Sequence, residues 1–154
     1  MQNYDAKIEE LGLKLPAAPS PMANYVTARR AGNLLFFSGA GPFVDGKPAV
    51  FGKVGAELTQ EQGYEAARLT GLNLIAQLKK ELGTLNSVKQ FLKVQEFVAS
   101  APDFMAQPSV MNGVSDLFVQ VFGEAGKHAR TAVAVPQLPF NIPIEVEMIV
   151  EVTD

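Results

Sequence analysis

Residues 129–152, ARTAVAVPQLPFNIPIEVEMIVEV, decide the fold that the sequence predicts. Apolar side chains alternate with other residues on both sides of a proline-rich stretch, which predicts two strands joined by a turn. The expected apolar positions are Thr131, Val133 and Val135 in the first strand, and Ile144, Val146, Met148, Val150 and Val152 in the second. Neighbouring side chains of a strand point to opposite faces. If the apolar faces share a core, Arg130 and the glutamates therefore lie together on the other face.

Arg130 stands out because its neighbours on that other face are small. Ala132 and Ala134 leave open space above the predicted sheet. A planar guanidinium needs such space to hold a carboxylate through two parallel hydrogen bonds. The alternative is that Arg130 and Glu145 are ion-pair partners on a solvated sheet face.

The composition indicates one domain and excludes several classes of function. The chain has 154 residues, of which 47% are apolar, enough for one core. It carries 13 Lys and Arg against 16 Asp and Glu, a net charge of -3, and no basic tract, which argues against nucleic acid as the main partner. Cysteine is absent, which excludes disulfides, thiolate metal sites and a cysteine nucleophile.

The N-terminal residues and the hydropathy pattern predict a cytoplasmic location. Residues 1–15 are polar and acidic, and lack the basic start and apolar run of a secretory signal. No window approaches the roughly 18 apolar residues of a membrane span. We therefore expect a soluble cytoplasmic protein without a membrane partner.

Hydrophobic periodicity predicts the other elements. The expected helices are residues 4–13, 59–82 and 108–123, and the expected strands are 34–37 and 87–99. Asp45-Gly46 indicates a hairpin between residues 43–44 and 49–51, and Thr59 with Gln62 matches a capping box. Residues 15–25 contain three prolines and predict an extended arm that ends at Tyr25.

The strand predicted over residues 87–99 is apolar on both faces. Leu92, Val94 and Val98 lie on one face, and Phe91 and Phe97 on the other. Two helices can cover only one face of a mixed sheet, so the second apolar face needs another cover. This pattern predicts an oligomer.

Several common catalytic motifs are missing. His128 is the one histidine, no HExxH motif is present, and the chain has no GxGxxG, GxxxxGK[ST] or GxSxG, since Ser38 lies in FFSGAG. We expect no metal and no cofactor. The groups that remain are an arginine, carboxylates, hydroxyls and backbone N–H groups, a set suited to binding a small carboxylate and activating a water beside it.

A family resemblance extends over about residues 20–152. The segments that carry it are Asn24-Tyr25, Gly32-Asn33-Leu34-Leu35-Phe36-Phe37-Ser38-Gly39, Leu72-Asn73-Leu74, Val88-Lys89, Asp103-Phe104, Asn112 with Phe118, Ala129-Arg130-Thr131, Leu138-Pro139 and Ile144-Glu145-Val146-Glu147. They resemble the Rid (reactive intermediate deaminase) or YjgF-like family, formerly the L-PSP endoribonuclease family. The Ala-Arg-Thr block followed by Ile-Glu-Val-Glu is the most specific part.

The resemblance implies a single α+β domain of chorismate-mutase-like type, with two helices on one face of a mixed sheet. The domain would span residues 1–154, with 1–24 forming the N-terminal helix and proline-rich arm. The resemblance further implies a homotrimer whose sheets form a central barrel, with active sites in the clefts between subunits.

The resemblance also implies roles for individual residues. Arg130 would hold the substrate carboxylate, and Glu145 would position or activate water. The cleft would be lined by Tyr25, Ser38, Gly39 and Asn112. The chain departs from the best-known deaminases at Ala132, where cysteine is common, and at Ala40, where glutamine is common.

These implications favour a cofactor-free deaminase that hydrolyses small enamine or imine acids, of the 2-aminoacrylate type, to a 2-keto acid and ammonia. The alternative is a trimer that binds a keto or amino acid through Arg130 without turning it over. The third hypothesis is an endoribonuclease or translation inhibitor, the older family label. The acidic balance, the single histidine and the absence of a basic tract argue against it.

Overall fold

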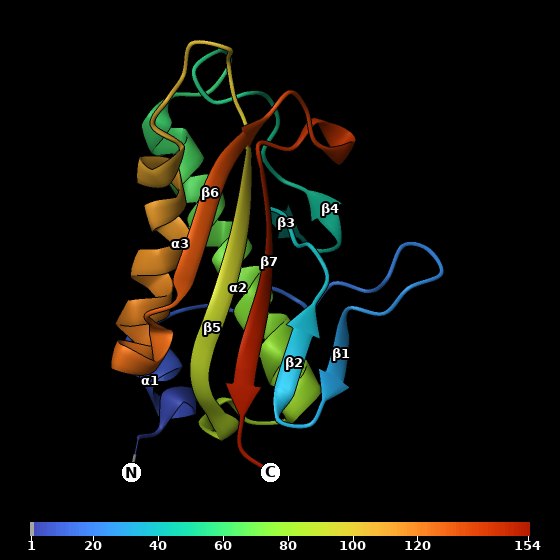
Figure 1. Cartoon of the computed structure of the whole chain (residues 1–154), viewed down its shortest axis with the longest axis vertical. Coiled ribbons are helices and arrows are strands. Elements are labelled where there is room, and N and C mark those ends of the chain that lie inside the picture. Colours follow the sequence, from blue (N-terminus) through green and yellow to red (C-terminus); the bar gives the residue numbers. More distant parts are fainter. Residues whose placement is uncertain (1) are drawn as a thin grey trace.

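The sheet of this protein has five strands in the order β1-β2-β7-β5-β6, in a computed structural model that describes residues 2–154. The strands are β1 Ala28–Ala31, β2 Leu34–Phe37, β5 Val88–Ala99, β6 Ala129–Val135 and β7 Ile144–Val152. β6 runs parallel to β5 and the other neighbouring pairs are antiparallel, so the sheet is mixed. β6 and β7 are consecutive along the chain, yet β5 lies between them (Figure 1).

Two long helices, α2 (Gln60–Leu82) and α3 (Gln107–Phe122), cover one face of this sheet (Figure 1). α2 begins with the predicted capping box: Gln62 N–H donates to Thr59 Oγ1 at 3.1 Å, and Thr59 N–H donates to Gln62 Oε1 at 2.8 Å. The helices approach closely at Gly113, where a Cβ would lie 2.2 Å from the Tyr64 carbonyl oxygen. The predicted α+β architecture with two helices on one face is confirmed.

Strand β5 departs from the simple alternation predicted for it. Phe91 is 2% exposed and packs against two phenylalanines of α3, with ring centroids 4.5 Å and 4.8 Å away. A shift of register between Phe91 and Lys93 marks a β-bulge, which lets Phe91 and Val94 face the same way. The prediction that Phe91 shares the opposite face with Phe97 is wrong.

Strand β6 faces the core with the side chains that were predicted to point away from it. Its register places Arg130 beside Val94 on the helix-covered face, and Val133 beside Phe97 on the uncovered face. Ala132 packs against the core because a small side chain fits beneath α3. The predicted core positions of this strand, Thr131, Val133 and Val135, therefore lie on the uncovered face.

β2 forms one hairpin with β1, and a second hairpin follows β2 along the chain. β1, which the sequence did not predict, pairs with β2 around a turn at Gly32-Asn33, where Gly32 has φ +59. A second sheet pairs β3 (Phe43–Val44) with β4 (Lys47–Pro48). The hairpin at Asp45-Gly46 is confirmed, but its second strand precedes the predicted residues 49–51.

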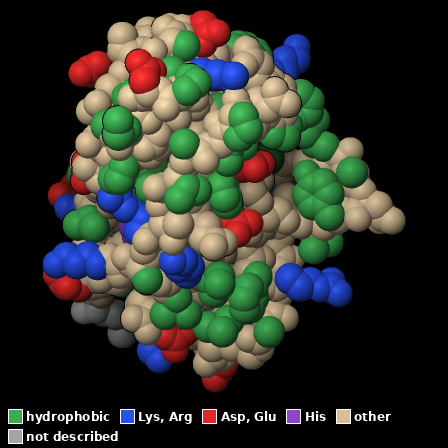
Figure 2. All heavy atoms as spheres, turned by 45° about the horizontal axis from the view of Figure 1, so that its top comes forward, with side chains coloured by type: hydrophobic (Ala, Val, Ile, Leu, Met, Phe, Trp, Pro, Cys, Tyr) green, Lys and Arg blue, Asp and Glu red, His purple; other side chains and the backbone are tan. Residues whose placement is uncertain are grey.

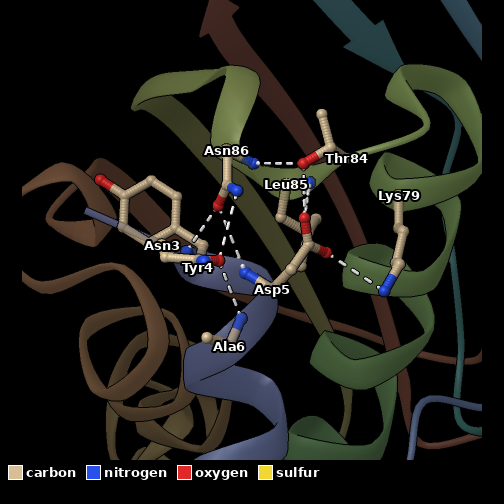
Figure 3. Close-up of polar contacts among 8 residues, drawn as sticks. All are labelled: Asn3, Tyr4, Asp5, Ala6, Lys79, Thr84, Leu85 and Asn86. Atoms are coloured by element: carbon tan, nitrogen blue, oxygen red, sulfur yellow. Dashed lines mark hydrogen bonds and ion pairs between the residues drawn. The ribbon is translucent and has the colours of Figure 1, made fainter. Parts of the chain in front are cut away.

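The N-terminal helix α1 (Tyr4–Glu10), shorter than predicted, is tied to the segment that follows α2 (Figure 3). Tyr4 N–H donates to Asn86 Oδ1 at 2.7 Å. The Asp5 carboxylate accepts from a backbone N–H of that segment at 3.1 Å and pairs with Lys79 of α2, also at 3.1 Å. These contacts dock the start of the chain on the body of the domain.

Short 3₁₀ segments complete the secondary structure: η1 Leu85–Ser87, η2 Gly123–Gly126 and η3 Pro139–Asn141. No helix within residues 2–154 has the length and apolar character needed to cross a membrane.

No helix within residues 2–154 covers the face of the sheet opposite α2 and α3. Phe36 of β2 and Val133 of β6 are 42% and 41% exposed there. Figure 2 shows hydrophobic side chains lying among acidic and basic ones on the surface seen from this side. An uncovered, partly apolar sheet face is a feature of subunits that associate, and the oligomer remains a prediction.

Candidate functional site

The predicted site residues form two separate groups in the folded chain. One group is Arg130 with Asn112; the other is Tyr25, Ser38, Gly39 and Glu145. The expectation that Arg130 shares a sheet face with the glutamates is wrong, because Arg130 lies beside Val94, whereas Glu145 lies beside Phe97 on the opposite face. The two groups are described in turn.

Arg130 is held by two side chains of α3. Its Nη1 donates to Asn112 Oδ1 at 2.8 Å and to Ser115 Oγ at 3.2 Å. Asn112 and Ser115 are three residues apart, so α3 presents both on one side. Within residues 2–154, Nε and Nη2 make no hydrogen bond, so the edge that they form has its donors unused, with Nε 3.9 Å from a buried carboxyl of β5. We call Asn112, Ser115, His128 and Arg130 the arginine cluster.

His128 extends this chain of hydrogen bonds. Its Nδ1 lies 2.8 Å from the Gly126 carbonyl oxygen, which only accepts, so Nδ1 carries the proton. Nε2 then accepts from Ser115 Oγ at 3.0 Å. Burial lowers the pKa of His128, the charge of Arg130 lowers it further, and the ring is neutral near pH 7. His128 therefore orients the Ser115 hydroxyl so that its lone pair faces Arg130.

Glu96 of β5 is a buried carboxyl beside the arginine cluster. It is fully buried, and neither of its oxygens has a hydrogen-bond partner within residues 2–154. Its Oε2 lies 3.9 Å from Arg130 Nε, too far for a hydrogen bond. Burial raises the pKa of Glu96 to about 8, although the charge of Arg130 opposes the shift. A neutral Glu96 at pH 7 leaves the charge of Arg130 available to a ligand.

Sequence reasoning missed Glu96, although a signal for it was present. Glu96 lies midway between Val94 and Val98, which were predicted to share one face of this strand, so it belongs to the same face. An acidic residue at a core position is rare unless it is paired or functional. The alternation alone therefore indicated a buried carboxyl at Glu96. The structure places it two residues from Val94, the residue beside Arg130.

A small pocket lies where the proline-rich arm meets the end of β2. It leaves about 60 Å³ open to the centre of a water molecule. Its lining includes Pro19, Met22, Tyr25, Ser38, Gly39 and Gln77. We call it the arm pocket, because residues 19–22 of the arm form one wall.

The predicted cleft residues Tyr25 and Ser38 line this pocket, and the hydroxyl of each already makes one hydrogen bond within the chain. Ser38 Oγ donates to the Val26 carbonyl oxygen at 2.7 Å, so this hydroxyl can only accept from a ligand. Tyr25 Oη accepts from Met22 N–H at 3.3 Å, which leaves its own proton free to donate. The two hydroxyls thus offer opposite hydrogen-bonding roles.

Glu145 lies directly over Gly39. A Cβ on Gly39 would be 3.0 Å from both Cδ and Oε1 of Glu145. Any larger residue at this position would therefore crowd the carboxyl. Glu145 is half-buried, and burial, reinforced by the nearby charge of Glu147, raises its pKa. A raised pKa makes the carboxylate a stronger base, which suits a group that takes a proton from water and returns it.

Glu145 and Arg130 lie far apart in space within one chain. Their partners on β5, Phe97 and Val94, are three residues apart, and Arg130 and Glu145 flank β5 on its two sides. That spacing corresponds to about 10 Å along the strands and about 10 Å across them. Because the side chains also point to opposite faces, one small substrate cannot contact both in the same chain.

No set of three or more His, Cys, Asp and Glu side chains within residues 2–154 is arranged to hold a metal ion. The groups that can contact a substrate are a guanidinium, carboxyls, hydroxyls and amides.

The sequence profile of one family matches residues 5–152, almost the whole chain; it is described as "YjgF/chorismate mutase-like, putative endoribonuclease". The chain belongs to the YjgF (Rid) family. The resemblance read from the sequence is thereby confirmed, and the matched region includes the arm and all of α1 after its first residue. Protein TCP17 of Trypanosoma cruzi is 44% identical over 150 residues, which cover 97% of this chain and 94% of that protein.

Solved structures confirm the YjgF-like fold. The protein Atu1372 from Agrobacterium tumefaciens is 42% identical, with a TM-score of 0.90 over 97% of this chain and 92% of that one. A protein of Shewanella oneidensis described as a "putative endoribonuclease" is 33% identical, with a TM-score of 0.94 over 98% of this chain and 100% of that one. Family and fold are thus established, whereas the roles of individual residues remain predictions.

Proposed function

We propose that this YjgF-family protein is a cofactor-free deaminase that hydrolyses small enamine or imine acids to 2-keto acids and ammonia. The observation that carries the proposal is the arginine cluster, where Asn112 and Ser115 occupy Nη1 of Arg130 and leave its other edge free. Such an edge fits a small planar carboxylate. The membership in the YjgF (Rid) family supports the reaction class.

Arg130 would bind the carboxylate that these substrates share. Its side chain is 27% exposed, so a ligand can reach it, while Glu96 behind it is fully buried. Because the pKa of Glu96 is raised to about 8, this carboxyl is largely protonated at pH 7 and does not compete with the substrate for the guanidinium.

Glu145 would activate the water. It accepts a proton from water while the water oxygen bonds to the imine carbon, and it passes that proton to the nitrogen. The resulting carbinolamine then collapses: the C=O bond forms, the C–N bond breaks, and the hydroxyl proton leaves with the nitrogen as ammonia. One water is consumed, and one 2-keto acid and one ammonia are released. The raised pKa of Glu145 suits this double role.

The reaction would take place between subunits. Arg130 and Glu145 face opposite sides of one sheet, so a complete site needs Arg130 of one chain and Glu145 of another. A heterologous interface that closes into a ring, such as a trimer, brings those two faces together at each contact. The partly apolar uncovered sheet face supports the same arrangement.

Ammonia release from enzymatically generated 2-aminoacrylate tests the reaction. We expect release faster than the uncatalysed rate, slowed strongly by Glu145→Gln, since the amide keeps the shape but is a far poorer base. Binding of a 2-keto acid without any faster release of ammonia would identify a binding protein and would contradict the deaminase.

A further inference from the structure

Gln77 of α2 is a buried amide without a partner. It is 4% exposed, and none of the hydrogen bonds among residues 2–154 involves its side chain, whose Oε1 is fully buried. Asn73, one turn earlier on the same side of α2, is also buried but donates to the carbonyl oxygens of Gly41, Phe43 and Leu69 at 3.2 Å, 2.9 Å and 3.1 Å. Asn73 thus holds the loop after β2, whereas Gln77 holds nothing in the chain.

The unpartnered amide lines the arm pocket. Buried amides are almost always hydrogen-bonded, and an exception that faces a cavity indicates a group that binds there. None of the residues lining the pocket carries a charge. A charged group would therefore enter without a counter-ion, which disfavours it strongly.

The hydrogen-bonding roles in the pocket define what fits. The Tyr25 hydroxyl has a free proton and the Ser38 oxygen can accept. The Gln77 amide carries donors and an acceptor that residues 2–154 leave unused. A primary carboxamide both donates and accepts, so it can satisfy Gln77 with two hydrogen bonds. An aliphatic group would leave the amide unpaired, which a site built to hydrogen-bond rejects.

Size and position agree with a substrate side chain. At about 10–15 Å³ for each water, the 60 Å³ of open space holds a group of about four to six non-hydrogen atoms. The pocket borders Gly39, over which the Glu145 carboxyl lies. Gly39 therefore joins the proposed catalytic carboxyl to the arm pocket, so the two are neighbours.

We infer that the arm pocket is the side-chain subsite of this enzyme, and that Gln77 selects substrates whose side chain ends in a neutral hydrogen-bonding group, above all a carboxamide. This inference rests on the proposed deaminase. It also gives the proline-rich arm a role, because Pro19 and Met22 close one wall of the subsite.

A pair of ligands of matched shape tests the inference. 2-Oxosuccinamate and 4-methyl-2-oxopentanoate differ in that a carboxamide replaces an isopropyl group. Their binding is measured by calorimetry, and ammonia release is measured with the corresponding imines, made from asparagine and leucine by an amino-acid oxidase. We expect the carboxamide to be preferred at least about tenfold in both measurements.

Gln77→Leu should abolish this preference, bringing the ratio of the two ligands to about one or below. Gln60→Leu, the same change on an exposed residue about 25 Å along α2, should keep the ratio of the unchanged protein. Circular dichroism and the thermal midpoint confirm that both variants fold.

The outcomes separate the inference from the proposed function. Turnover of both imines with equal preference, or a preference that survives Gln77→Leu, overturns the inference alone. A preference in binding that Gln77→Leu removes, without any ammonia release, upholds the subsite and overturns the deaminase. Failure to bind either keto acid overturns both.

Discussion

Arg130 and Glu145 lie on opposite faces of one sheet, on either side of β5 and three residues apart along it. Neither side chain can swing around the sheet, because Arg130 is fixed by Asn112 and Ser115, and Glu145 is seated over Gly39. A single chain therefore keeps these two side chains apart. Any chemistry that uses both residues on one small molecule requires a second copy of the chain.

Arg130→Lys should weaken 2-keto acid binding at least about tenfold without unfolding the protein. Lysine keeps the charge but cannot bond Asn112 and Ser115 while offering a second planar edge. Calorimetry with a 2-keto acid measures the loss. Arg30→Lys, at an exposed position of β1 beside Leu35, is the matched control and should bind like the unchanged protein. Equal affinity of both variants would mean that Arg130 has only a structural role.

Gly39→Ala should slow turnover about tenfold or more and leave the fold intact. The new methyl group would lie 3.0 Å from the Glu145 carboxyl, which must move by a few tenths of an ångström. A displacement of this kind in a reacting group is costly to the rate. Initial rates of ammonia release check the prediction, and an unchanged kcat would show that the position of Glu145 does not matter.

Glu96 should make the protein less stable as the pH rises. Its pKa is raised from the ordinary 4.5 to about 8 in the folded chain, so between these values the folded state binds a proton that the unfolded state releases. Its contribution to stability is complete below about pH 4.5 and is lost as the pH rises through 8. The loss is at most about 1.4 kcal/mol for each pH unit.

The measurement is the urea midpoint at pH 5, 7 and 9 for the unchanged protein and for Glu96→Gln. The variant cannot ionise at this position, so its stability relative to the unchanged protein should rise with pH. Glu9→Gln, at an exposed position of α1, should follow the unchanged protein. Parallel curves for all three proteins would show that Glu96 does not titrate in this range.

Asp5→Ala should lower the free energy of unfolding by about 1–3 kcal/mol. The change removes the acceptor of the Leu85 N–H and the partner of Lys79, both of which dock α1 (Figure 3). Glu10→Ala removes an exposed pair with Lys7 and should cost at most about 0.5 kcal/mol. Urea denaturation compares the two, and equal losses would show that the Asp5 contacts do not anchor the helix.

Much of the fold could be predicted from local chemistry. The capping box at Thr59, the Asp45-Gly46 turn and the long apolar stripe of α2 each have a physical cause within a few residues. The family resemblance implied two helices on one face of a mixed sheet. It also named candidate residues in both groups, and their roles stay predictions.

The remaining features depend on contacts that alternation does not reveal. The bulge after Phe91 reverses the faces of the residues before it. Arg130 points toward α3, where it donates hydrogen bonds to Asn112 and Ser115. Thr131 and Val133 look like core residues because the uncovered face is itself partly apolar. Gln77 escaped notice because one buried amide within a helical stripe carries no signal until its lack of partners is seen.

The most direct test of the central claim, that the site joins two chains, is to mix Arg130→Lys with Glu145→Gln. Each variant alone has a defect in every site. If each site takes Arg130 from one chain and Glu145 from the next, hybrids formed by co-expression contain some sites with both native residues.

Random assembly at equal amounts makes about one quarter of the sites complete. We therefore predict that hybrids release ammonia from 2-aminoacrylate at about one quarter of the rate of the unchanged protein, well above either variant alone. Hybrid oligomers that are no more active than the separate variants would contradict a site shared between subunits.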